Sequence, residues 1–383
     1  MDEQMNSAVN RELHHRGRTS QIPIYLGKLL RNFAYMNDWK VLPMAAVIAG
    51  LVAMVIRSGF FVSMEGTLQG ALALTCVGLW NGCFNSIQSV CRERDIVKRE
   101  HRSGMHIFPY VVSHMIYQAL LCLAQTIITI YVFSRVGIKF PDTGLWSGSS
   151  EIEFGLTLFL ISYASDMLSL LVSCLAHSTT AAMTVMPFLL IMQLVFSGGF
   201  FTLPDWATGL SKLSISSYGV KCVCAQADYN QKPMWAGWNV ISGMRDQDIE
   251  ITMTQGQILD VISDKENPLM KGAADIPIMP DDPILGDITI GDAMDALAEA
   301  EIDEETRSTE VTVTYKVQDL LDMFGERKVF EAVTGKSAEA AQKPIYEHTK
   351  ANVISCWIAL VLYTMVCSFL AAVALKFIDK DKR

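Results

Sequence analysis

Long apolar stretches separated by polar segments dominate this sequence. A helix needs about 20 mainly apolar residues to cross the hydrocarbon core of a bilayer. Six stretches meet or nearly meet that length: Val41–Ile56, Thr67–Val90, His106–Phe133, Phe154–Ala176, Thr179–Phe201 and Val353–Phe377. Because backbone polar groups inside a bilayer must be satisfied within the protein, these stretches predict an all-α integral membrane protein with six transmembrane helices.

The overall composition agrees with that fold class and excludes others. Of the 383 residues, 51% are hydrophobic and only 19% are charged, whereas soluble domains average about 25% charged residues. No basic stripe with interleaved aromatic residues is present, which argues against nucleic-acid binding. Residues 1–20 lack the apolar core of a signal peptide, so we expect the first span to direct the chain to the membrane.

The distribution of Lys and Arg predicts the orientation of the chain. Basic residues cluster in the N-terminal segment, in the segment after the second span and in the C-terminal tail, while residues 58–66 have none. Since short inner loops carry an excess of Lys and Arg, both termini and the loop 91–105 are predicted to be cytoplasmic. Residues 231–350 are then outside.

The sequence divides into five predicted parts around these spans. Residues 1–40 form a cytoplasmic segment, 41–201 hold the first five spans, and 351–383 hold the sixth span and a tail. Within the first part, Leu26, Leu29, Leu30 and Phe33 recur at helical spacing. This pattern predicts an amphipathic connecting helix on the inner membrane surface, with a soluble linker helix as the alternative. The remaining parts are 202–230 and 231–350.

Residues 231–350 are acidic and polar, and they are too many for a plain loop. Alternating stretches at 249–254, 288–290 and 311–315 are each followed by a helix-like run. Thr254 and Thr289 are candidate N-caps, and Pro277, Pro280 and Pro283 mark a loop. We therefore expect a small α/β ectodomain between the fifth and sixth spans.

A partial phosphate-binding motif occurs in this acidic segment. Thr334-Gly-Lys-Ser resembles the end of a phosphate loop, but Phe330 stands where that loop requires glycine. No cysteine and histidine set has the spacing of a zinc site, and no hydrolase motif is present. The sequence thus predicts no catalytic residue, no metal ligand and no directly bound cofactor.

The second span leads directly into a charged helix on the inner side. Glu93 and Glu100 are seven residues apart and therefore share one helix face. The spacing alone favours a solvated charged face. Asn81 and Asn85 in the second span and Asp166 in the fourth are either helix-to-helix hydrogen-bonding groups or the wall of a polar pathway.

Two linked motifs then indicate a family. Glu93-Arg94, Arg99-Glu100, Gly104 and Tyr110 form the first, and Phe196–Phe201, Pro204-Asp-Trp and Leu213–Gly219 form the second. Together with the connecting helix, they resemble the permeases of G-type (type-2, ABC-2-like) ABC exporters. The resemblance covers about residues 20–230 and the last span, but not 231–350.

The resemblance implies roles for individual residues. The helix with Glu93, Arg94, Arg99, Glu100 and Gly104 would couple the permease to an ABC ATPase subunit or domain, which would hold ATP and Mg. A second copy of the permease would face the second and fifth spans across the substrate path. That path would be lined by Asn81, Phe84, Asn85, Met192 and Phe196, and Phe200 and Phe201 would form the outer gate. Residues 202–230 would form a re-entrant outer hairpin.

Three further questions remain open from the sequence. A membrane sensor with a ligand-binding ectodomain is the alternative function. The ectodomain has no N-x-S/T acceptor, which favours a bacterial plasma membrane. Cys222 and Cys224 are too close in sequence for an unstrained mutual disulfide. They are buried thiols, a bridge to the second copy, or modified.

Overall fold

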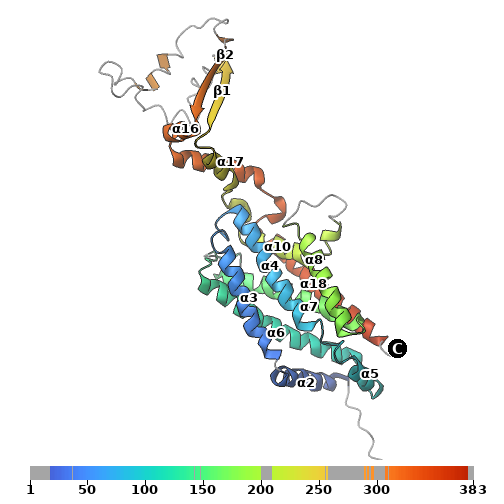
Figure 1. Ribbon diagram of the computed structural model, residues 1–383. Coiled ribbons are helices and arrows are strands. Elements are labelled where there is room, and N and C mark those ends of the chain that lie inside the picture. The colour runs from blue at the N-terminus through green and yellow to red at the C-terminus, as the bar shows by residue number, and fades with distance from the viewer. Residues whose placement is uncertain are drawn as a thin grey trace, which may run out of the picture. The chain divides into compact units, whose positions relative to one another are not determined.

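The computed structural model describes residues 18–36, 38–141, 143–146, 148–199, 209–254 and 310–377, with short pieces at 256–257, 289, 291–292, 295–296 and 307–308. The chain divides into two compact units. The first unit consists of Met1–Lys232 with Gln342–Arg383, and the second of Pro233–Ala341. We describe each unit by itself (Figure 1).

The described part of the first unit is built from helices. Two short helices, η1 (Arg18–Gln21) and η2 (Asp38–Lys40), flank α2 (Ile22–Tyr35), which occupies the residues predicted for the connecting helix. The others are α3 (Val41–Ile56), α4 (Met64–Ser86), α5 (Arg94–Arg102), α6 (Ile107–Val136), α7 (Ser150–Leu175), α8 (Thr179–Val195), α10 (Ile215–Gln226), η3 (Tyr229–Gln231), η4 (Pro344–Tyr346) and α18 (Lys350–Lys376).

Four of these helical stretches are long and apolar enough to cross a membrane. They are Asp38–Ile56, Ile107–Val136, Ser150–Leu175 and Lys350–Lys376. The helix α4 is long enough but carries Glu65 and several side-chain amides, and α8 is apolar but has only 17 residues. The prediction of a helical membrane protein is confirmed, while a count of six spans stays a prediction.

The helix α7 lies at the centre of the first unit and packs against α4, α6, α10 and α18. Its closest neighbour is α4, where a Cβ atom built at Gly82 would lie 2.1 Å from the Ser162 carbonyl oxygen. Small residues let helices in a bilayer approach closely enough for van der Waals packing to hold them together. Gly78 and Gly82 therefore fix the α4–α7 contact on which the candidate site is built.

The observed helix ends correct two predicted boundaries. The second span was expected over Thr67–Val90, but α4 begins at Met64 because Ser63 caps it, accepting a hydrogen bond from Gly66 N at 3.1 Å. It ends at Ser86, and the turns that follow are held by Ser173 Oγ, which accepts from Val90 N and Cys91 N. These two bonds come from a distant part of the chain, so sequence periodicity did not reveal them.

The fifth helix is also shorter than expected. The predicted span Thr179–Phe201 is helical as α8 only to Val195, and Gly198 follows with a left-handed φ of 71°. The predicted gate residues Phe200 and Phe201 lie outside the described residues. Part of the predicted hairpin 202–230 is also outside them, and its described part includes α10, which packs against α4, α7 and α18.

The second unit contains one sheet and three helices in its described part. Strands β1 (Asp248–Thr254) and β2 (Glu310–Lys316) pair antiparallel with Ile251 opposite Val313. The helices are α11 (Ala236–Gly243), α16 (Val317–Phe324) and α17 (Glu326–Ala341). Trp238 packs edge-on against Phe330, with ring centroids 5.2 Å apart, and joins α11 to α17.

The Thr334–Ser337 motif lies inside α17, so it forms a helix rather than a phosphate loop. The proline loop at 277–283 lies outside the described residues.

Candidate coupling surface and polar pocket

The acidic face of α5 is bound to the connecting helix α2. Lys28 Nζ lies 3.3 Å from Glu93 Oε2 and 3.2 Å from Glu100 Oε1, so one ammonium group holds both carboxylates. Asn32 Nδ2 donates to Glu93 Oε1 at 3.3 Å. The seven-residue spacing places both glutamates on one face, as expected. That face contacts a neighbouring helix within the chain and is therefore not simply a solvated surface.

Arg94 and Gly104 fix the two ends of α5. The Arg94 guanidinium donates to the carbonyl oxygens of Cys174 and Ala176, both at 3.0 Å, at the C-terminal end of α7. A cation is favourable at that end because the last carbonyl groups of a helix are unpaired. Gly104 adopts a left-handed φ of 104°, which glycine tolerates best. Gln21 Nε2 donates to the Gly104 carbonyl oxygen at 3.4 Å and joins this turn to η1.

The face of α5 that carries Asp95, Ile96 and Arg99 is exposed, and we call it the open face. Arg99 and Asp95 are exposed, and Ile96 is an apolar side chain 39% exposed on an otherwise charged helix. Val97, one residue further on, is buried in the core with Tyr110 and Leu170. The helix is thus anchored on one side and presents a mixed apolar and basic surface on the other.

Three aromatic rings run from α2 into α6. Tyr25 meets Tyr110 edge-on at 5.6 Å between centroids, and Tyr110 meets His114 at 4.7 Å. Burial, with the nearby Glu100 carboxylate, raises the pKa of Tyr25 to about 12. Tyr25 therefore stays a neutral hydrogen-bond donor next to Glu100 at any physiological pH.

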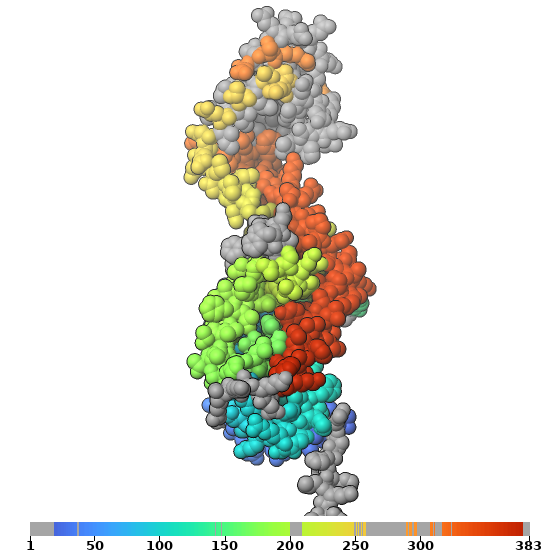
Figure 2. Space-filling model, turned by 90° about the vertical axis from the view of Figure 1, so that its right-hand side faces the viewer, coloured from blue at the N-terminus to red at the C-terminus, as the bar shows by residue number. Residues whose placement is uncertain are grey.

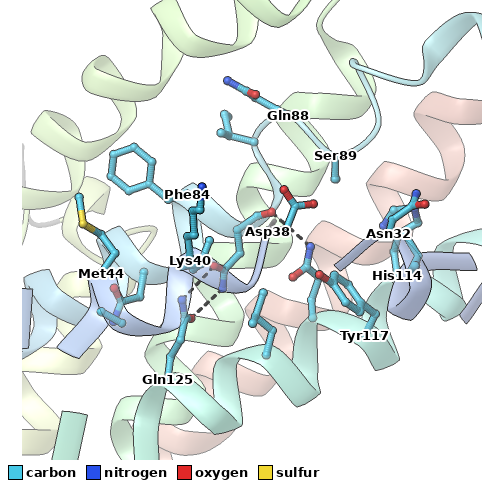
Figure 3. Close-up of a pocket in the computed structure, with 18 of the residues that line it drawn as sticks. Asn32, Asp38, Lys40, Met44, Phe84, Gln88, Ser89, His114, Tyr117 and Gln125 are labelled. Atoms are coloured by element: carbon cyan, nitrogen blue, oxygen red, sulfur yellow. Dashed lines mark hydrogen bonds between the residues drawn. The ribbon is translucent and has the colours of Figure 1, made fainter. Parts of the chain in front are cut away.

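A pocket of about 540 Å³ opens between α2, η2, α3, α4 and α6 (Figure 3). In this view, Met44 and Phe84 lie at one end, Asn32, His114 and Tyr117 at the other, and Asp38 and Lys40 between them. Ile48 and Leu121 add apolar surface, and Arg92 adds a cation. The pocket therefore combines a polar end, an apolar end and charged groups of both signs.

Amide groups line the wall that α4 and α6 share. Asn85 Nδ2 donates to Gln125 Oε1 at 2.8 Å, and Gln125 Nε2 donates back to Asn85 Oδ1 at 3.0 Å. Gln118 Nε2 reaches the Asn85 carbonyl oxygen at 3.5 Å. Gln118 Oε1 and both ring nitrogens of His114 are buried without a hydrogen-bond partner among the described residues. An unpaired buried polar atom costs about 1–3 kcal/mol, so these atoms mark a place where a ligand or water would be stabilised.

Asp166 lies behind this wall and does not line the pocket. Its side chain is fully buried, and Oδ2 accepts from Cys122 Sγ at 3.3 Å. Ser86 Oγ donates to the Asp166 main-chain carbonyl oxygen at 2.6 Å. Of the two interpretations open from the sequence, this geometry favours the structural one, in which Asp166 joins α4, α6 and α7.

Comparison with known proteins decides the family. The model of the ABC-2 type transporter family matches residues 28–226, which is more than half of the chain and includes α5 and the pocket. This chain is a member of the ABC-2 type transporter family. It is also similar to an ABC transporter ATP-binding/permease protein of Mycobacterium tuberculosis, with 30% identity over 131 residues. That match covers 33% of this chain and only 15% of the relative.

The predicted residues of the ABC-2 permease path do not all meet within one chain. Asn81, Phe84 and Asn85 line the pocket from α4. Met192 is on α8 and 51% exposed, and Phe196 follows the end of that helix. Neither of these two lines the pocket. Their role in a path stays a prediction that involves a second copy.

Sequence reasoning missed several residues of the site. Lys28 and Asn32 were not predicted as site residues, because nothing local indicates a partner more than 60 residues away. His114, Gln118 and Gln125 lie at spacings of four and seven residues along the third span. That spacing is typical of one helix face, so it could have indicated a polar stripe along α6.

Proposed function

We propose that this ABC-2 family member is the permease of an ATP-driven exporter, working with a separate or fused nucleotide-binding domain. In this proposal six helices cross a cell membrane, namely α3, α4, α6, α7, α8 and α18, with both termini on the cytoplasmic side. ATP and Mg would bind to the nucleotide-binding domain. The name of the mycobacterial relative joins ATP-binding and permease functions in one protein.

The geometry of α5 carries this proposal. Lys28 of α2 and the C-terminal end of α7 both bind α5 away from its open face. A force applied to the open face is therefore transmitted directly to α2 and α7. Ile96 and Arg99 on the open face provide an apolar contact and a cation, and arginine is one of the residue types that dominate binding energy at protein interfaces. We infer that the nucleotide-binding domain contacts this face.

A second copy of the permease is the proposed partner within the membrane. Phe188, Ile191 and Met192 on α8 and Trp80 and Phe84 on α4 are all exposed. Figure 2 shows that α8 and α18 both present surface on the same face of the first unit. In the proposed dimer, α4 and α8 of the two copies enclose the substrate path and substrate passes by alternating access. Phe196 would lie near its outer end, with Phe200 and Phe201 as the gate.

The proposed docking can be tested with the open face of α5. We expect Ile96→Glu with Arg99→Glu to lower the affinity for the nucleotide-binding domain about tenfold or more, because the apolar contact and the cation are both removed. The measurement is binding of the nucleotide-binding domain to the permease in detergent. As a matched control, Arg135→Glu at the far end of α6 removes an exposed cation and should leave binding unchanged.

ATP hydrolysis provides a second test. The chain purified alone should show no ATP turnover, because the only phosphate-loop-like motif in the sequence lies inside α17. Robust turnover by the isolated chain would refute the proposed division of labour. Equal binding of the nucleotide-binding domain to wild type and the α5 double variant would refute the proposed docking face.

A further inference from the structure

The pocket between α2, α3, α4 and α6 has the features of a site for an amphiphile. We propose that it binds the head group of a glycerophospholipid with a primary ammonium group, of the phosphatidylethanolamine class, drawn from the inner leaflet. The membrane orientation used here rests on the proposed function. The chemistry of the site itself is argued below from the pocket alone.

The charged groups of the pocket suit a zwitterion. Lys40 is exposed and has no ion-pair partner among the described residues. Arg92 lies 3.8 Å from Asp38, which is too long for a hydrogen bond. Glu93 is already held by Lys28 and Asn32. Lys40 can thus bind a phosphate group, and a zwitterionic head group can replace the loose Arg92–Asp38 ion pair, with its phosphate on Arg92 and its ammonium group on Asp38.

The unpartnered buried atoms favour a ligand with N–H donors. Gln118 Oε1 can only accept a hydrogen bond, and it is buried without a donor among the described residues. A primary ammonium group has three donors, enough for Asp38 and Gln118 together. His114 carries one ring N–H when neutral, which can donate to a phosphate or ester oxygen. A choline head group has no N–H and would leave Gln118 unsatisfied.

The size and the apolar end of the pocket fit a lipid that is only partly enclosed. A volume of about 540 Å³ is that of a site for a small molecule, so a head group and glycerol fit while the acyl chains must leave. Met44 and Phe84 stand at the apolar end (Figure 3), and they are 62% and 53% exposed. The acyl chains would leave past Met44 on α3 into the surrounding hydrocarbon, while Phe84 on α4 borders the proposed path.

The position of η2 and α2 agrees with a site at the membrane surface. Asp38 and Lys40 lie in η2, immediately before the apolar helix α3, and Asn32 lies in the amphipathic helix α2. Basic pockets between membrane helices on the cytoplasmic side bind anionic lipid head groups, and the phosphate group of phosphatidylethanolamine offers the same charge to Lys40 and Arg92. A bound head group would contact α2, α3, α4 and α6 at once and would therefore stabilise the arrangement that holds α5.

The test compares two lipids that differ only at the head-group nitrogen, which carries three N–H donors in one and three methyl groups in the other. The purified, delipidated full chain is titrated with phosphatidylethanolamine and with phosphatidylcholine of the same acyl chains, and bound lipid is counted by native mass spectrometry. We expect one tightly bound phosphatidylethanolamine per chain, with phosphatidylcholine about tenfold weaker, because one to two hydrogen bonds to buried groups are lost. Equal affinity for the two lipids would overturn the proposal.

Matched variants then locate the site. Gln118→Leu should reduce phosphatidylethanolamine binding to the phosphatidylcholine level and leave phosphatidylcholine binding unchanged. Thr126→Val, on the same helix and also buried but outside the pocket, should change neither. A similar loss in both variants would overturn the assigned site. If Gln118→Leu does not fold, the wild-type comparison still decides the proposal.

Two controls separate this inference from its alternatives. Water-soluble glycerophosphoethanolamine should compete weakly, because it lacks the acyl chains that leave past Met44. Competition at lipid-like affinity would overturn an origin in the leaflet. Binding of the nucleotide-binding domain is measured in a separate assay, without added lipid. Failure of lipid selectivity and failure of ATPase docking are therefore distinguishable.

Discussion

At the scale of single residues, the contact between α4 and α7 depends on the absence of a side chain at Gly82. We expect Gly82→Ala to lower the free energy of unfolding by about 1–3 kcal/mol, because its Cβ would lie 2.1 Å from the Ser162 carbonyl oxygen and 2.9 Å from Asp166 N. Thermal unfolding of the purified chain in detergent measures this. Gly155→Ala on α7 is the control, since its Cβ would meet only Ile130 at 3.8 Å, and alanine favours the helix. Equal effects of the two substitutions would contradict this account.

The two cysteines of α10 lead to a prediction at the same scale. Cys222 and Cys224 are both fully buried and free. The Cys222 thiol lies 3.5 Å from Thr157 Oγ1 and packs with Val353 and Cys356. Because neither sulfur is open to a second copy, we expect no reducible dimer on non-reducing gels of the wild type. A dimer band that disappears in Cys222→Ser or Cys224→Ser would show that the hairpin lies at a subunit contact.

At the scale of elements, Lys28 joins α2 to α5 through its ion pairs with Glu93 and Glu100. We expect Glu93→Ala and Glu100→Ala to leave membrane insertion intact and to change the free energy of unfolding by less than about 1 kcal/mol, because these ion pairs are partly exposed. If α5 transmits force, each substitution should lower transport per ATP hydrolysed at least about fivefold. Vesicles containing the permease with its nucleotide-binding domain provide the measurement. Glu347→Ala, at an exposed carboxylate far from α5 in the sequence, should keep normal coupling, and normal coupling in both glutamate variants would contradict a role of these ion pairs in coupling.

The elements also show which features could be predicted from the sequence. The bounds of α3 were predicted residue for residue, because Arg57 ends an uninterrupted apolar run. The end of α4 was missed because Ser173, far along the chain, supplies the bonds that hold the following turns. The spacing of Glu93 and Glu100 correctly indicated one shared face, but their partner Lys28 depends on packing between α2 and α5. Only half of the pocket was predicted, because the polar residues of the second span were assigned to a path and those of the third span were not.

At the scale of the whole molecule, the family match and the acidic segment account for different parts of the chain. The match ends at residue 226, and the second unit begins at Pro233. The chain is therefore an ABC-2 type membrane unit into which a separate compact unit is inserted before its last helix. The resemblance carried by Glu93–Gly104 and Phe196–Gly219 extends to the first unit alone, which is why it left the second unit to be predicted from strand alternation and caps.

The second unit has internal contacts of its own, from which we predict that it folds alone. Strands β1 and β2 pair over seven residues, from Asp248 opposite Lys316 to Thr254 opposite Glu310. Thr254 and Gln257 exchange the reciprocal hydrogen bonds of a capping box, with distances of 3.2 and 3.3 Å. We expect residues 233–341, expressed alone, to give dispersed amide signals in a nuclear magnetic resonance spectrum. The excess of acidic residues in this segment should keep it soluble at neutral pH.

A substitution at a ring contact inside this unit also tests whether residues 233–341 fold alone. Phe330 forms T-shaped ring contacts with both Trp235 and Trp238, at 6.4 and 5.2 Å between ring centroids, and so joins α17 to α11. Because Phe330 is half-buried, Phe330→Ala should lower the free energy of unfolding by about 1–3 kcal/mol, less than at a fully buried phenylalanine, and it should reduce the amide dispersion of the isolated unit. Lys336→Ala, on the same helix and exposed, should leave the spectrum unchanged. A random-coil spectrum from the wild-type segment would mean that the unit needs the membrane helices on either side in order to fold.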